Sequence, residues 1–156
     1  IQIAVNLWVS DPSSATTTYG AISTWDVSNV TNMSTLFINK SNFNSDISNW
    51  DVSNVTNMRY MFSSATVFNG NVSSWDVSSV TNMGGMFYNA TSFNQDIGSW
   101  DVSSVTNIQS MFVNATSFNN GGATDIGGWD VSNVTTMINM FNGATIFNQF
   151  SFNISE

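Results

Sequence analysis

Apolar and polar positions along this chain follow one pattern that returns about every 25 residues. Successive tryptophans, Trp25, Trp50, Trp75, Trp100 and Trp129, lie 25, 25, 25 and 29 residues apart. The longer interval contains an extra glycine-containing stretch at 121–124, which we expect to lie in a surface loop. A fixed period of roughly 20 to 50 residues is typical of a solenoid, in which each coil stacks on the next.

Each repeat combines two periodicities. Trp50 and Val52 alternate with polar neighbours, which predicts a short strand with one buried face. The apolar positions from Met58 to Phe68 then follow helical spacing, which predicts a short helix. The sequence therefore predicts an α/β solenoid. We expect it to be a leucine-rich-repeat-like, right-handed coil of about five strand–turn–short-helix repeats with a parallel sheet.

The two ends of the chain depart from the repeat. Residues 1–9, IQIAVNLWV, and the segment after Phe147 both alternate apolar and polar side chains, which predicts extra terminal strands. A polar segment with the single proline follows the first of these and is interpreted as a linker. We therefore expect an N-terminal strand and linker at 1–21, acting as a cap or a donated strand. The repeat solenoid follows at 22–147, and a C-terminal strand at 148–156.

Composition and charge exclude several classes of function. Charged residues make up 8% of the chain and the net charge is −8, with Lys40 and Arg59 as the only cations. A nucleic-acid-binding surface needs clustered basic residues, so no nucleic acid is expected as a partner. No apolar run reaches the length of a transmembrane segment. With no histidine and no cysteine, the common nucleophile–base pairs cannot form, and we expect no enzymatic activity.

The repeated unit carries a family resemblance. The pattern F-N-x-D-I-x-x-W-D-V-S-x-V-T-N-M-x-x-M-F recurs from Ile22 to Phe147. It resembles the bacterial surface protein repeat of about 25 or 26 residues, the BspA-like relatives of leucine-rich repeats. The resemblance implies an exported or cell-surface protein in a family associated with adhesion and interaction. It supplies no catalytic residues.

The terminal strands suggest how such a protein could assemble. A strand donated to the sheet of a neighbouring molecule makes a head-to-tail contact that generates a filament. The leading hypothesis is thus a non-catalytic, extracellular structural protein, glycosylated, that self-associates into a surface fibril. The alternative is a monomeric cell-surface adhesin or recognition module that binds a protein or a glycan. The expected assembly residues are Ile1, Ile3, Val5, Leu7, Val9, Phe150, Phe152 and Ile154.

Glycosylation sequons of the form N-x-[ST] recur at fixed positions of the repeat. One group follows the Met-Phe pair on the expected outer surface, and a second lies inside the phrase that begins with tryptophan. An exposed sequon in an exported protein can carry a glycan. The candidate sites are Asn89, Asn114, Asn39, Asn54, Asn29 and Asn133.

Two further columns have alternative interpretations. The stacked tryptophans suit core packing, while an exposed aromatic column could bind sugar rings. The aspartates that follow them would repel one another, unless each accepts backbone N–H bonds in its turn or calcium lies between the coils. No cofactor is expected, with Ca²⁺ as the open alternative. The candidate metal ligands are Asp26, Asp51, Asp76, Asp101 and Asp130.

Overall fold

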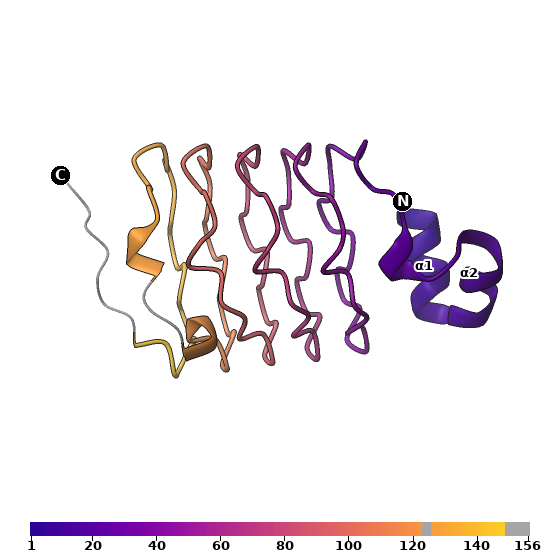
Figure 1. Ribbon diagram of the computed structural model, residues 1–156. Coiled ribbons are helices and arrows are strands. Elements are labelled where there is room, and N and C mark those ends of the chain that lie inside the picture. The colour runs from indigo at the N-terminus through magenta and orange to yellow at the C-terminus, as the bar shows by residue number, and fades with distance from the viewer. Residues whose placement is uncertain (123–125, 149–156) are drawn as a thin grey trace.

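The computed structural model describes residues 1–122 and 126–148 as a row of stacked coils with two helices at the N-terminal end (Figure 1). The α-helices of the described residues are α1 (Gln2–Ser10) and α2 (Pro12–Tyr19). Short 3-10 turns occur at η1 (Ile22–Thr24), η2 (Asn120–Gly122) and η3 (Ile126–Gly128).

The predicted α/β class is wrong. Residues 1–122 and 126–148 contain no β-strand and no parallel sheet, and the described residues of the repeats contain no α-helix. Neighbouring coils are joined by single parallel bridges, one per interface, at Asn32, Asn57, Asn82, Asn107 and Thr136. The backbone turns too often for a strand to form: near the bridge residue Asn57, the Val55 N–H bonds to the Val52 carbonyl at 2.8 Å.

The expected repeat helices are replaced by consecutive turns. In a helix the Phe62 N–H would bond to the Met58 carbonyl, but it bonds instead to the Met86 carbonyl of the next coil at 2.9 Å. Tyr60 and Ser64 adopt left-handed conformations, with φ of 55° and 58°, which interrupt a right-handed helix. The equivalent pairs in the other coils are Thr35 and Asn39, Gly85 and Asn89, Ser110 and Asn114, and Asn139 and Gly143.

These turns leave alternate N–H groups free to join the coils. In the second coil the N–H groups of Met58, Tyr60, Phe62 and Ser64 donate to carbonyls of the third coil at 2.7–3.0 Å. The N–H groups between them close turns within the coil, as Met61 does to Met58 at 3.1 Å. The backbone polar groups are therefore satisfied along the stack without a sheet.

The core consists of aromatic columns that run along the stack. Phe62 is fully buried and stacks on Phe37 and Phe87 of the adjacent coils, with centroids 5.2 and 5.7 Å apart. Within its own coil it stacks on Phe68 at 4.0 Å. Offset-stacked rings contribute free energy of stabilisation in addition to that from the burial of their surface area. Repetition of these contacts in every coil aligns one coil on the next.

The segment predicted as an N-terminal strand is helix α1, and the predicted linker contains α2. Val5 is completely buried, and the side chains of Gln2 and Trp8 bond to the first repeat coils at the Leu36 carbonyl (3.0 Å) and Ser45 Oγ (2.9 Å). The strand interpretation of Ile1, Ile3, Val5, Leu7 and Val9 is therefore wrong. A short, largely apolar segment fits both the two-residue period of a strand and the roughly 3.6-residue period of a helix. Packing against the first coil favours the helix.

Helix α2 has clear start and stop signals. The Asp11 side chain accepts the Ser14 N–H at 3.0 Å, Pro12 occupies the first turn, and Gly20 ends the helix with a φ of 77°. The predicted C-terminal strand, with Phe150, Phe152 and Ile154, lies outside the described residues.

Candidate functional site

The aspartate column follows the outer corner of the coils. Each carboxylate accepts the backbone N–H of the residue two positions later; in Asp51 this is Ser53 at 3.1 Å, whose hydroxyl also donates at 2.6 Å. The hydroxyl and then the N–H of Ser53 lower the pKa of Asp51, and this outweighs the opposing charge of Asp26. The backbone N–H two positions later donates to the carboxylate in the same way at Asp26, Asp76, Asp101 and Asp130.

The turn interpretation of the aspartates is therefore confirmed, and these hydrogen bonds offset the repulsion between neighbouring carboxylates. Within the described part of the chain, no group of three or more acidic side chains is placed to hold a metal ion. Calcium binding by this column stays a prediction.

The tryptophan column belongs to the core. Trp50 is 3% exposed, and its indole N–H donates to the Ile22 carbonyl at 2.8 Å. Trp75, Trp100 and Trp129 make equivalent bonds to carbonyls of the preceding coil. The core interpretation is confirmed for these four side chains. Trp25 is the exception, because it is only half-buried.

The sequon asparagines lie on two parts of the surface. Asn89 and Asn114 occupy left-handed turn positions in adjacent coils, and the Asn114 amide donates to Asn89 Oδ1 at 2.9 Å. Asn39 lies at the equivalent turn of the first coil. The other group is exposed: Asn29, Asn54 and Asn133. In this group the amides of Asn54 and Asn133 donate to serine carbonyls of neighbouring coils. Their occupancy by glycans stays a prediction.

Our sequence analysis missed a column of asparagines that joins the coils. Asn69 Oδ1 accepts the Asn94 N–H at 2.9 Å, and Asn94 Oδ1 accepts the Asn119 N–H at 2.8 Å. Asn44 begins the same column. The signal was the asparagine of the repeated F-N dipeptide, whose position after a buried phenylalanine suits a turn that faces the next coil.

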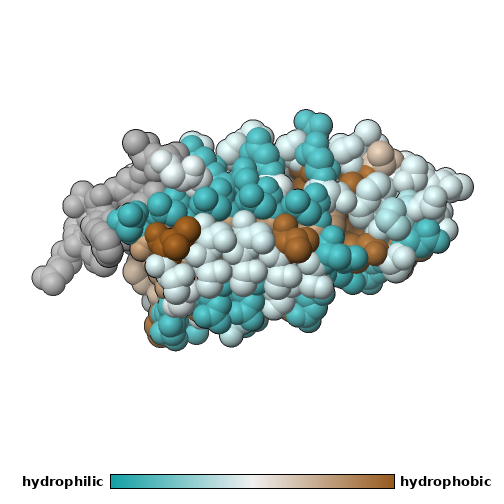
Figure 2. All heavy atoms as spheres, turned by 90° about the horizontal axis from the view of Figure 1, so that it is seen from below, coloured by the Kyte–Doolittle hydropathy of each residue, from teal (hydrophilic) through white to brown (hydrophobic). Residues whose placement is uncertain are grey.

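The surface between these columns is mainly polar. Figure 2 shows one face of the molecule on which hydrophilic and neutral side chains dominate and hydrophobic side chains gather in a few separate places. Exposed large apolar residues in the repeat coils are Val67, Ile138 and Ile146. Isolated residues of this kind are ordinary on a protein surface.

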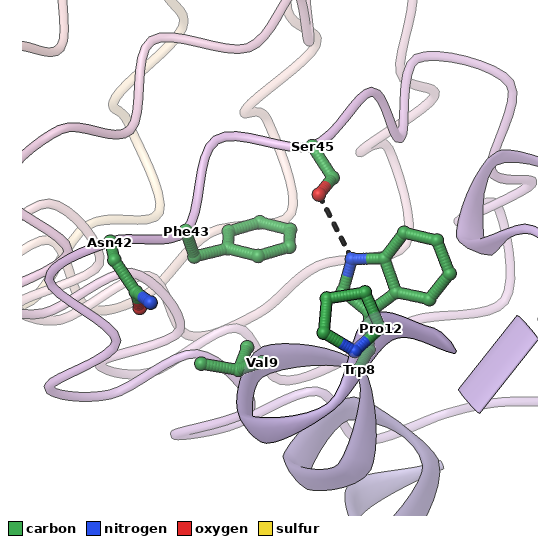
Figure 3. A pocket seen from close by; sticks show the side chains of 6 residues that line it. All are labelled: Trp8, Val9, Pro12, Asn42, Phe43 and Ser45. Carbon is green, nitrogen blue, oxygen red and sulfur yellow. Dashed lines mark hydrogen bonds between the residues drawn. The ribbon is translucent and has the colours of Figure 1, made fainter. Parts of the chain in front are cut away.

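Two hollows border the junction between the helices and the first repeat coils. The smaller, of about 100 Å³, lies beside the Trp8–Ser45 hydrogen bond, and its apolar wall includes Val9, Pro12 and Phe43 (Figure 3). The larger, of about 390 Å³, we name the junction hollow. It is lined by Ile1, Ala4, Tyr19, Thr24, Trp25, Asp26 and Val30. Both combine aromatic rings with polar groups, which is typical of small-ligand sites.

None of the helices in the described residues combines the length and the apolar character that a membrane span requires. Neither a curated protein nor a solved structure matches the chain. Residues 11–123, and in a second match residues 99–156, agree with a family described as Mycoplasma protein of unknown function, DUF285. The first match alone covers more than half of the sequence. The chain therefore belongs to this bacterial repeat family, DUF285.

Proposed function

We propose that this protein is a non-catalytic recognition module displayed outside a bacterial cell. Membership of a bacterial repeat family supports the setting, and the finer resemblance to BspA-like surface repeats supports a role in adhesion. In this proposal the stacked coils form a stiff scaffold, and the exposed side chains and hollows of the described surface provide the contacts with a ligand.

The observation that carries the proposal is the closed N-terminal end of the stack. Helix α1 covers the first coil, with Val5 buried and with Gln2 and Trp8 bonded to the coils. A fibril built through a donated strand at residues 1–9 would require this helix to leave its place and change conformation. The closed end favours a discrete module over that form of polymer.

Two measurements test this function. Antibodies raised against the purified chain should label intact bacteria, and analytical ultracentrifugation over a wide concentration range should give one discrete species. Labelling only after permeabilisation would contradict the external location. Filaments in negative stain, with loss of the discrete species, would favour the structural fibril instead.

Glycosylation is a separate element of the proposal. Peptide mapping of protein from its native source should find glycan on Asn89 or Asn114. The direct hydrogen bond between their amides puts the two sites close together, so we expect one glycan to hinder the other. Unmodified peptides at both positions would remove the glycoprotein element and leave the recognition role untouched.

A further inference from the structure

Trp25 is the one member of the tryptophan column that borders helices instead of a preceding coil. Trp50 stacks against it with centroids 6.3 Å apart and the rings 19° from parallel. Tyr19, at the end of α2, meets it nearly edge-on, at 6.0 Å and 73°. Tyr19 is 44% exposed, and Trp25 is half-buried where the inner tryptophans are closed off. The two rings therefore form an aromatic corner that opens into the junction hollow.

Two hydrogen-bond donors of this corner already have acceptors within the chain. The indole N–H of Trp25 is already bonded to the Gly20 carbonyl at 3.0 Å, and the Thr24 hydroxyl donates to the Ala21 carbonyl at 2.8 Å. Asp26 adds an exposed carboxylate, whose pKa is lowered first by the hydroxyl of Ser28 and then by its N–H, so it is ionised at neutral pH.

This combination favours a cation with an apolar surface. Ring faces attract cations electrostatically, and a nearby carboxylate adds charge complementarity. The two cationic side chains of the chain, Lys40 and Arg59, are not among the residues that line the hollow. The remaining wall, with Ala4 and Val30, offers methyl groups. It would suit methylated nitrogen better than a strongly hydrated primary ammonium group.

We propose that the junction hollow binds a quaternary ammonium group, with the cation against the rings of Tyr19 and Trp25 and beside the carboxylate of Asp26. The volume of about 390 Å³ lies within the ordinary range for small-ligand sites. The ligand chemistry is that of choline, either free or as the headgroup of a phosphatidylcholine membrane. This inference rests on the proposed function only for its biological setting, since binding is a property of the purified chain.

The test is a titration of the full chain with choline, followed by NMR of the tryptophan indole N–H signals. We expect a saturable shift that is largest for Trp25. The neutral isostere 3,3-dimethylbutan-1-ol has the same shape without the charge and should bind at least roughly fivefold more weakly. Equal binding of the two compounds, or no saturable shift with choline, would overturn the proposal.

Two matched variants separate the effect of the Asp26 charge on binding from any effect of the substitution on folding. Asp26→Asn removes the charge and keeps the turn, because Asn71 makes the same bonds to the N–H and hydroxyl of Ser73, at 3.0 and 2.7 Å. It should weaken choline binding roughly tenfold, while Asp51→Asn, at the same position one coil away, should leave it unchanged. Equal effects of the two substitutions would show that the site is elsewhere.

A second variant tests the ring. Tyr19→Ala changes a partly exposed side chain at the end of α2 and should weaken choline binding severalfold. Loss of the edge-on contact with Trp25 should lower the unfolding midpoint only slightly, so the variant stays folded during the titration. Unchanged affinity in this variant would contradict the aromatic corner.

Flotation with phosphatidylcholine and phosphatidylglycerol vesicles identifies the source of the quaternary ammonium group. Selective binding to phosphatidylcholine indicates a headgroup site, and choline binding without flotation indicates a free ligand. Surface labelling of cells stays an independent measurement, so either proposal can fail alone.

Discussion

The stacked phenylalanine columns can be tested by replacing one ring in the middle of the stack. Phe62 is fully buried and contacts four other rings, those of Phe37, Phe68, Trp75 and Phe87, at centroid distances of 4.0–6.2 Å. Each aromatic pair contributes about 0.5–1.5 kcal/mol beyond the burial of its area. At the lower limit, the four pairs together contribute about 2 kcal/mol. Phe62→Leu keeps an apolar side chain and removes all four contacts. We therefore expect a loss of about 2–4 kcal/mol in the free energy of unfolding.

The assay is urea-induced unfolding followed by circular dichroism, with the wild-type slope as a check that the transition is unchanged in character. Met61→Leu is the control, because Met61 is equally buried and conservative apolar swaps of this kind cost less than about 1.5 kcal/mol. If the two substitutions destabilise the chain equally, ring stacking adds nothing to burial and the reasoning is refuted.

Three further predictions concern turns and carboxylates. Gly85→Ala should cost about 1–3 kcal/mol, because Gly85 has a φ of +63° and the ring of Tyr60 occupies the space of the new methyl group. Gly128→Ala, with no atom within 4 Å, should change the unfolding midpoint little, and equal effects would contradict this account. Asn94→Ala removes the acceptor for two backbone N–H groups and should cost about 1–2 kcal/mol by the same assay, while Asn94→Asp should retain most of that stability. Because hydrogen bonds lower the pKa of Asp51 from 3.8, its contribution to stability is complete above that value and is lost as the pH falls through the folded-state pKa. The urea midpoint should therefore fall on acidification below about pH 4, and less steeply in Asp51→Asn; an unchanged slope would contradict the assignment.

The repeat length and most of the buried core residues can be predicted from the sequence. The tryptophan spacing matches the coil-to-coil hydrogen bonds, and the apolar positions that repeat, such as Phe62 and Trp75, are the buried ones. The Asx turns were also accessible, because aspartate followed two positions later by serine has a well-defined local chemistry.

The secondary structure could not be derived from the same pattern. The spacing of apolar residues from Met58 to Phe68 fits a helix. A series of consecutive tight turns produces the same spacing, because it also places an apolar side chain in the core every three or four residues. Tyr60 and Ser64 adopt left-handed conformations although neither is a glycine, the residue type that would have predicted them. Bonds to the neighbouring coil fix these conformations, and such long-range partners are not visible in a local window.

The N-terminal end shows a second limit. An isolated alternating segment favours a strand, and only the first coil, against which Val5 and Trp8 pack, provides the surface that stabilises a helix there. The junction hollow also depends on how the N-terminal helices pack against the first coil. Tyr19 and Asp26 come from different elements, so their proximity depends on how α2 meets the first coil.

The direction of the hydrogen bonds between coils has a mechanical consequence. These bonds lie along the stack, so a tensile load across its two ends falls on all the bonds of one interface together. An interface of this kind should hold until it fails as a unit and then release a whole coil. A repeat of 25 residues would lengthen by roughly 80–90 Å when extended. Under a steady pull the chain would yield one coil at a time, in steps set by the 25-residue repeat except at the longer 29-residue interval, and each step would dissipate energy before the next coil opens.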